Sequence, residues 1–139
     1  MKRIAVLTSG GDAPGMNAAI RSVVRLALSR GIQVTGVRHG YQGLMTGDFV
    51  AMDSAAVGGI IEEGGTILRT ARSEIFATDA GQAGATAALR RADLEGLVVI
   101  GGNGSQNGAL ALHRRSLPVV GVPSTIDNDL RGTDMSIGA

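Results

Sequence analysis

Two glycine-rich turns and one pair of carboxylates are the residues of this chain best suited to chemistry. One turn spans 10–15 and the other spans 101–105, and each follows a short apolar run typical of a buried strand. Asp127 and Asp129 follow a third such run. Glycine turns expose backbone amides that bind phosphate, and aspartates serve as metal ligands or proton acceptors. The combination predicts phosphoryl transfer.

Neither glycine turn fits a standard nucleotide fingerprint. The spacing from Gly10 to Gly15 matches the opening of a Walker A loop, but Met16 and Asn17 occupy the positions of its Lys and Ser/Thr. The glycines at 102, 104 and 108 do not have the G-x-G-x-x-G spacing. One such turn alone would be interpreted as an ordinary strand-to-helix connection. Two turns after two strands favour an anion site made by backbone N–H groups and helix N-termini.

The charged candidates each have a functional and a structural interpretation. In an extended loop Asp127 and Asp129 lie on one side, so one could accept a proton while the other holds Mg²⁺; the alternative is an ordinary polar turn. Arg72 lies in a loop that could reach the same edge and neutralise a transferring phosphoryl group, although a lone loop arginine is usually just solvated. Arg21 and Arg25 are four residues apart, which by itself indicates a charged outer helix face.

Composition limits the function classes. The 139 residues suffice for one domain, with 44% hydrophobic and 18% charged residues, as in a globular protein. A net charge of +1 and an aromatic content of 2% disfavour a polynucleotide partner. The absence of cysteine excludes disulfides, thiol nucleophiles and thiolate zinc sites. The N-terminal apolar run is too short for a membrane span, so we expect a cytoplasmic protein with no membrane partner.

Apolar runs alternate with helical patterns along the chain. Strands are expected at 3–8, 32–38, 48–52, 67–68, 97–100 and 118–122. Helices are expected from 16 to a cap at Gly31, at 54–63, at 80–92 and at 105–115, the last capped by Ser105, with a glycine-rich loop at 39–43. This alternation predicts an α/β fold with a doubly wound, mostly parallel sheet, whose ligand edge lies at the carboxyl ends of the strands.

Four motifs carry a family resemblance. LTSGGDAPGMNAAIR, GGTILRTAR, LVVIGGNGS and PSTIDNDLRGTD resemble bacterial ATP-dependent 6-phosphofructokinases of the type A group. The resemblance implies transfer of the ATP γ-phosphoryl group to the 1-hydroxyl of fructose 6-phosphate with Mg²⁺ in glycolysis. It implies a homotetramer of subunits with two Rossmann-like lobes, regulated by ADP or phosphoenolpyruvate. Residues 1–139 would be the incomplete first, ATP-binding lobe, and the sugar-phosphate lobe would be absent.

The resemblance also implies residue roles. It implies an ATP site formed by Gly11, Tyr41, Arg72, Ser73, Gly102, Asn103, Gly104, Ser105 and Gly108. Thr125 and Asp127 would contact the sugar phosphate, with Asp127 as general base. Asp129 would support the metal and the reacting phosphoryl group. The implied catalytic residues are Asp127, Asp129, Arg72 and Thr125. Arg21 and Arg25 resemble effector-site arginines.

Several positions depart from the family pattern. Asn103 stands where the family has a Mg²⁺-coordinating aspartate, and an amide lacks the anionic oxygen that a hard cation prefers. Ser124 replaces a glycine, and Gly59 replaces a frequent acidic effector-site residue. Gly104 leaves room for the α-phosphate, which favours ATP over pyrophosphate. The chain ends soon after Asp129, so we expect it alone to bind fructose 6-phosphate poorly, to turn over little, and to self-associate through exposed apolar surface.

Two alternatives to a kinase lobe stay open. The first is a catalytically silent nucleotide- or phosphate-binding module, favoured by Asn103 and the early end of the chain. The second, less favoured, is an NAD-dependent oxidoreductase on the same fold. The missing G-x-G-x-x-G spacing speaks against it, and Val37-Arg38-His39 closes the second strand without the acidic residue that would bind a ribose.

Overall fold

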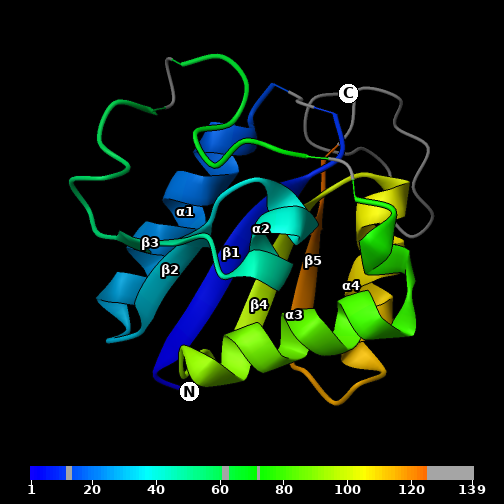
Figure 1. Ribbon diagram of the computed structural model, residues 1–139. Helices are drawn as coiled ribbons and strands as arrows, with labels where there is room; N and C mark the ends of the chain where they lie inside the picture. Colours follow the sequence, from blue (N-terminus) through cyan, green and yellow to red (C-terminus); the bar gives the residue numbers. More distant parts are fainter. Residues whose placement is uncertain (12–13, 61–62, 72, 125–139) are drawn as a thin grey trace.

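A five-stranded sheet runs through the centre of the molecule (Figure 1). The computed structural model describes residues 1–11, 14–60, 63–71 and 73–124. The strands are β1 (Arg3–Ser9), β2 (Gln33–Val37), β3 (Phe49–Met52), β4 (Gly96–Gly101) and β5 (Val119–Pro123). They lie in the order β3-β2-β1-β4-β5, and every pair is parallel except β2 and β3. The expected doubly wound, mostly parallel sheet is confirmed.

The central strand β1 is buried on both faces. Ala5, Val6 and Leu7 are all 0% exposed, which is why the strand is a continuous apolar run rather than an alternating one. Because successive side chains point to opposite faces, Ala5 and Leu7 pack into one apolar cluster and Val6 into another. The sheet therefore divides the core into two layers.

Helices cover both faces of the sheet. α1 (Met16–Ser29) packs on the face of Val6, together with the segment around Val57 and Leu68. The other face carries α2 (Gly40–Thr46), α3 (Asp79–Arg91) and α4 (Asn103–His113), with the short 3₁₀ helix η2 (Ile75–Ala77) beside them. From β1 the chain passes through α1 to β2 on one side of β1, whereas β4 lies on the other side of β1. This reversal places a topological switch point between β1 and β4.

Three sequence predictions about local structure were wrong. The expected loop at 39–43 begins a helix, α2, because Tyr41 and Leu44 are buried in the core and this packing outweighs the poor helix propensity of glycine. Among the described residues of 54–63 there are turns and no α-helix, since Gly59 has a left-handed φ of +76°. The expected strand at 67–68 is a turn.

The expected capping role of Ser105 was also wrong. α4 begins two residues earlier, at Asn103, and its N-cap residue is Gly102. Ser105 lies inside the first turn and is 4% exposed. Glycine at positions 101 and 102 allows the chain to turn directly from β4 into the helix, so no polar cap is needed at 105.

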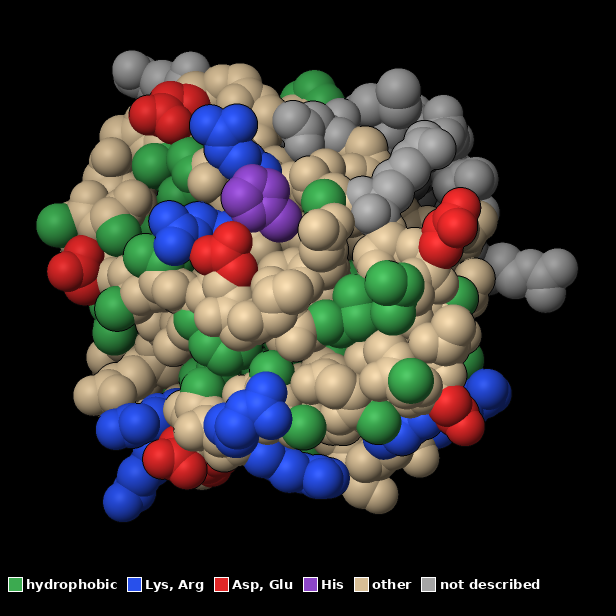
Figure 2. Space-filling model, in the orientation of Figure 1, with side chains coloured by type: hydrophobic (Ala, Val, Ile, Leu, Met, Phe, Trp, Pro, Cys, Tyr) green, Lys and Arg blue, Asp and Glu red, His purple; other side chains and the backbone are tan. Residues whose placement is uncertain are grey.

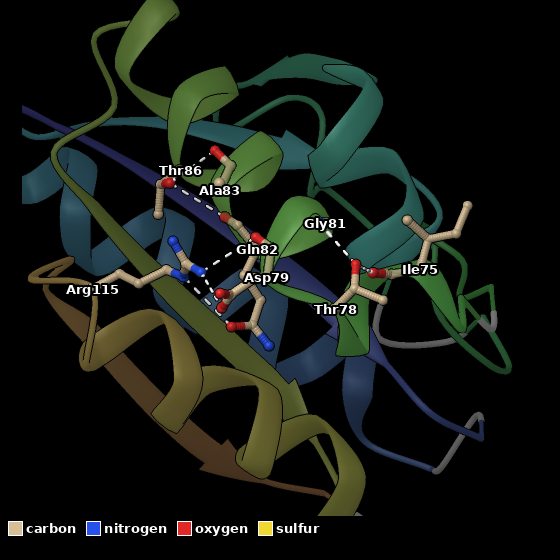
Figure 3. A network of polar contacts seen from close by, with 8 residues as sticks. All are labelled: Ile75, Thr78, Asp79, Gly81, Gln82, Ala83, Thr86 and Arg115. Carbon is tan, nitrogen blue, oxygen red and sulfur yellow. Dashed lines mark hydrogen bonds and ion pairs between the residues drawn. The ribbon is translucent and has the colours of Figure 1, made fainter.

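A polar network fixes the start of α3 (Figure 3). Thr78 is its N-cap: the side-chain oxygen accepts a hydrogen bond from Gly81 N at 3.0 Å, and the hydroxyl donates to Ile75 O at 2.6 Å. Arg115, just beyond α4, donates from Nη2 to Asp79 Oδ1 at 2.7 Å and from Nε to Gln82 Oε1 at 3.4 Å. The network joins the beginning of α3 to the end of α4. It therefore holds together the two helices that precede and follow β4 in the chain.

Two glycines of α3 give a matched test of this packing. A Cβ on Gly81 would contact Ile75 O and lie 2.9 Å from Phe76 Cα, whereas a Cβ on Gly84 would meet nothing within 4 Å. Gly84→Ala should therefore raise the free energy of unfolding by about 0.5–1 kcal/mol, and Gly81→Ala should lower it by about 2 kcal/mol. Urea unfolding followed by circular dichroism measures both. Equal effects at the two positions would contradict the described contact between α3 and η2.

Candidate functional site

The two glycine-rich turns meet at the carboxyl ends of β1 and β4. A Cβ on Gly101 would lie 2.5 Å from Ser9 O and 2.5 Å from Ser105 Oγ, and a Cβ on Gly10 would lie 3.3 Å from the same Oγ. Gly10 has a φ of +82°, a left-handed conformation that favours glycine. The turns therefore touch because these positions lack side chains. The prediction that they converge at one edge of the sheet is confirmed.

Each turn leads into a helix that has no side-chain cap. The N-cap residues are Gly15 for α1, with a φ of +91°, and Gly102 for α4, and within the part of the chain that the structure describes neither helix has a side-chain cap hydrogen bond. The first N–H groups of a helix have no intrahelical partner and carry the positive end of its dipole. Two glycine-led helix N-termini at one switch point are suited to bind an extended anion such as a polyphosphate.

A cavity of about 1120 Å³ lies beside the two turns. Its lining includes eight of the nine residues implied for the ATP site: Gly11, Tyr41, Ser73, Gly102, Asn103, Gly104, Ser105 and Gly108. The ninth, Arg72, lies outside the described residues, but its neighbours Ala71 and Ser73 line the cavity. The structure thus brings together segments that are far apart in the sequence, and direct contact of each residue with ATP stays a prediction.

The remaining predicted residues lie elsewhere. Thr125, Asp127 and Asp129 fall outside the described residues, although Ser124, the residue before them, lines the cavity. Arg21 and Arg25 are on α1 and do not line it. Arg25 is exposed, whereas Nε of Arg21 is buried and has no hydrogen-bond partner among the described residues.

An aromatic stack forms the apolar wall of the cavity. The rings of Tyr41 and Phe76 are parallel to within 8°, with centroids 4.0 Å apart. A Cβ on Gly108 would lie 2.8 Å from Tyr41 Cζ and 2.9 Å from Phe76 Cε2. The neighbours of Gly108 are therefore these two rings. The glycine lets α4 lie against the stack, so the cavity lining combines two aromatic rings with the two glycine-rich turns.

The hydroxyl of Tyr41 is already engaged within the protein. It donates a 2.6 Å hydrogen bond to Ser105 O, the carbonyl of a residue in the second turn. Burial raises the pKa of Tyr41 far above its ordinary value, because the charged phenolate would be desolvated. The hydroxyl therefore links α2 to α4 by a hydrogen bond. The ring is the part of Tyr41 that remains to contact a ligand.

This raised pKa predicts a measurable alkaline effect. Tyr41 is the only tyrosine, so tyrosinate absorbance near 295 nm reports on it alone. Below about pH 10 the phenol is neutral in the folded and unfolded states; above that pH the unfolded state ionises first and stability falls. We expect the absorbance of the folded protein to stay low at pH 11 and to rise on unfolding. Titration of the folded protein near pH 10 would show that the hydroxyl is not buried.

Sequence reasoning missed the residues that hold the segment before Arg72. Asn17, only 2% exposed, donates from Nδ2 to Glu63 O at 3.2 Å and accepts from Ile67 N at 2.8 Å. Thr8, at the end of β1, donates to Arg69 O at 3.0 Å. The only signal in the sequence was an asparagine among the apolar residues at the start of the predicted helix. These bonds tie the segment 63–71 to β1 and α1, beside the first turn.

A second, smaller cavity is a weaker candidate. It measures about 660 Å³ and is lined by His39, Glu63, Gly64, Thr66, Ile67, Arg69 and Thr70. Near it, a hydrogen bond from His39 to Asp48 lowers the pKa of that carboxyl, and the Arg38 guanidinium lowers it further. Glu63 and Arg69 bring opposite charges to the lining. The larger cavity, where the predicted residues gather, is the candidate site.

Charged side chains do not concentrate at the candidate site. On the face shown in Figure 2, the Lys and Arg side chains gather chiefly along the edge where β1 begins, at the opposite end of the strands from the turns. No group of three His, Asp or Glu side chains suited to a metal occurs within 1–11, 14–60, 63–71 and 73–124. In these same ranges no helix is long and apolar enough to cross a membrane. Glu74 is the only charged side chain among the described residues that line the cavity, so an anion there would be held by backbone amides and helix N-termini.

Comparison with known proteins gives consistent matches over almost the whole chain. The phosphofructokinase family model matches residues 3–139. The ATP-dependent 6-phosphofructokinases of Thermotoga neapolitana and Thermus thermophilus are 59% and 58% identical to it; each match covers 99% of this chain and 44% or 43% of the relative. The chain thus spans less than half the length of these curated relatives.

Solved structures agree with the described fold. Phosphofructokinase from Pichia pastoris in the T-state has a TM-score of 0.95 at 38% identity, covering 99% of this chain and 16% of that one. A pyrophosphate-dependent phosphofructokinase from Marinobacter aquaeolei has a TM-score of 0.86 at 25% identity, covering 99% and 37%. Because the family model matches residues 3–139 and solved phosphofructokinases share the fold, the chain belongs to the phosphofructokinase family.

Proposed function

We propose that this chain binds ATP at the junction of the two glycine turns and serves as the nucleotide-binding lobe of a 6-phosphofructokinase. In that role the γ-phosphoryl group would pass from ATP to the 1-hydroxyl of fructose 6-phosphate. The observation that carries the proposal is the contact between the turns after β1 and β4 beside a cavity of about 1120 Å³. The names of the bacterial relatives, ATP-dependent 6-phosphofructokinases, support the same donor and reaction class.

The lining of the cavity suits both the phosphates and the base of a nucleotide. Backbone amides of the turns would hold the phosphates, and the Tyr41–Phe76 stack would contact the base. Nothing lies within 4 Å of a Cβ built on Gly104, so the turn leaves space beside the helix N-terminus for an α-phosphate. The apolar wall favours a nucleotide over pyrophosphate, which has no base to occupy it.

The acceptor side of the reaction rests on residues outside the described ranges. Asp127 would take the proton of the attacking hydroxyl, and Thr125 would contact the sugar phosphate. Arg72 would neutralise charge on the transferring group, and Asp129 would support the metal and the reacting phosphoryl group. A positioned base typically contributes about 10²–10⁴-fold to the rate.

Assembly, effector binding and location also belong to the proposal. We expect a homo-oligomer in the cytoplasm, with an anionic effector near Arg21 and Arg25. The buried Nε of Arg21, which has no partner within the described ranges, supports an additional hydrogen-bond acceptor there.

The described residues do not fit a Mg²⁺ site. Asn103 opens α4 at the edge of the cavity, and its amide supplies no anionic oxygen. This same residue favours a second candidate function, a catalytically silent module that binds nucleotide or phosphate without transferring a phosphoryl group.

Calorimetry with ATP, ADP and AMP tests the proposal. Because the phosphates would contact two helix N-termini, we expect ATP to bind at least about tenfold more tightly than AMP, a difference of about 1.4 kcal/mol. Gly84→Ala, far from the turns in sequence and free of contacts at its Cβ, should bind ATP like the parent chain. Equal affinity for ATP and AMP, or no ATP binding by folded protein, would disprove the phosphate site. Phosphorylation of fructose 6-phosphate would exclude the silent module.

A further inference from the structure

The side chain of Gln106 joins three backbone carbonyls at the ends of two strands. Gln106 lies in the first turn of α4, and its Nε2 is 3.1 Å from Gly101 O, 3.2 Å from Val122 O and 3.4 Å from Val99 O. Val99 and Gly101 belong to β4, and Val122 belongs to β5. Only the nitrogen of the amide can face these three oxygens favourably, because it is a donor and they are acceptors. The amide therefore fastens the end of β5 to the end of β4.

Gly121 provides the space for this amide. A Cβ built on Gly121 would overlap Gln106 Oε1, and the next contacts are to the other atoms of the same amide. The φ of Gly121 is not in the left-handed region, so the backbone itself would accept another residue. The steric reason for glycine at this position is the side chain of Gln106.

β5 has few other anchors. It pairs with β4 only, at the edge of the described sheet, and Val120 is 61% exposed. Burial of apolar side chains therefore holds this strand less firmly than β1 or β4. With little burial to fix it, the hydrogen bonds at its end decide where the chain leaves the sheet.

Ser124, the next residue after β5, connects this anchor to the candidate site. Its N–H donates to Gly101 O at 2.9 Å, the same carbonyl that accepts from Gln106. Ser124 is 1% exposed and lines the cavity with Gly102 and Ser105. One helical turn thus supplies the predicted phosphate site and also secures the strand that leads to Thr125 and Asp127 in sequence.

We infer that Gln106 is a positioning residue that locks the exit of β5 against the second glycine turn. Its amide fixes the place of Ser124 relative to the predicted phosphate site. The functional part of this inference rests on the proposed function; the structural part does not. Placement matters because an error of about 1 Å between reacting groups can cost about 10²-fold in rate.

Amide hydrogen exchange in the absence of nucleotide tests the lock directly. Gln106→Met keeps a similar length without a donor, and Gly121→Ala displaces the amide while leaving Gln106 in place. In both variants the Ser124 amide should exchange about tenfold faster. The Leu97 amide, which donates to Pro118 O at the other end of the β4–β5 pair, should be unchanged relative to the parent chain.

A pH profile separates donation from packing. In Gln106→Glu the introduced carboxylate cannot donate, so Ser124 should lose protection at pH 7. It should regain protection near pH 4, where the carboxyl becomes protonated, and Gln106→Met should show no such recovery. Exchange is corrected for its intrinsic pH dependence and compared with Leu97. The control is Gln42→Met, an exposed glutamine of α2, which should leave both amides unchanged.

The outcomes are distinct. Faster exchange at Ser124 alone supports the lock, whereas equal acceleration at Leu97 and Ser124, or none at Ser124, overturns it. Calorimetry adds the functional readout: Gln106→Met should weaken ATP binding several-fold, and unchanged affinity would refute the link to the phosphate site. If the parent chain itself binds no ATP, the proposed function fails while the exchange result still decides the lock.

Discussion

Replacing Gly101 by alanine is expected to abolish ATP binding and to lower the free energy of unfolding by about 3 kcal/mol. The new Cβ would lie 2.5 Å from Ser9 O, 2.5 Å from Ser105 Oγ and 2.6 Å from Ser105 Cβ. One of these contacts is with backbone at the end of the central strand, which cannot rotate away. The two turns would be forced apart, and with them the two helix N-termini that are proposed to share the phosphates. Urea unfolding and calorimetry measure the two effects.

Gly104→Ala is the matched variant for this prediction. It makes the same chemical change three residues later in the same turn, where a Cβ meets nothing within 4 Å. The fold should be retained or slightly stabilised, since alanine is favoured over glycine in a helix by about 1 kcal/mol. Any loss of ATP affinity in Gly104→Ala would then come from the ligand side alone. If Gly101→Ala bound ATP like the parent chain, contact between the turns would not be the basis of the site.

Asn103→Asp is expected to make ATP binding strongly dependent on Mg²⁺. Without Mg²⁺, the added carboxylate at the edge of the cavity should repel the triphosphate and weaken binding. With Mg²⁺, the same carboxylate provides an anionic oxygen and should tighten binding about tenfold, which corresponds to about 1.4 kcal/mol. Attraction between unit charges near a protein surface, about 4 kcal/mol at 4 Å, is large enough for this gain. Calorimetry with and without Mg²⁺ gives both values.

Asn107→Asp controls for charge alone. Asn107 is on the same helix and also lines the cavity, one turn farther from the helix start. Its carboxylate should weaken ATP binding whether or not Mg²⁺ is present. If Asn103→Asp and Asn107→Asp behave alike, position 103 has no special relation to the metal. If Asn103→Asp gains Mg²⁺-dependent binding without turnover, the silent-module function is favoured over the kinase lobe.

The five strands of the sheet and the meeting of the two turns were predictable because their signals are local. Ala5, Val6 and Leu7 form an uninterrupted apolar run, as does the segment 97–100, and only a strand buried on both faces needs such a run. Glycines directly after these runs indicate tight turns into helices. Parallel strands then bring those turns to one edge without further information.

Other features depend on contacts that no local pattern reveals. α2 forms despite Gly40 and Gly43 because Tyr41 and Leu44 pack into the core. Gly108 is explained by the Tyr41–Phe76 stack, and Phe76 comes from a different part of the chain. The role of Gln106 depends on carbonyls of β4 and β5, and the partner that requires glycine at 121 is 15 positions away by residue number. Such residues are identified only after the strands are placed side by side.

The central place of β1 also affects how this chain acquires its fold during synthesis. β1 is made first, yet one of its two neighbours is β4, and Lys2 N donates to Glu95 Oε1 across 93 positions of sequence. Pairings between strands so far apart in sequence form slowly, because the entropy cost of closing a long loop comes before the stabilising contacts form. A nascent polypeptide leaving the ribosome therefore has β1 and β2 available for pairing, but one edge of β1 stays open until β4 emerges. Nucleotide could not stabilise the folding chain before that moment, because the second glycine turn of its proposed site follows β4 and would not yet have been translated.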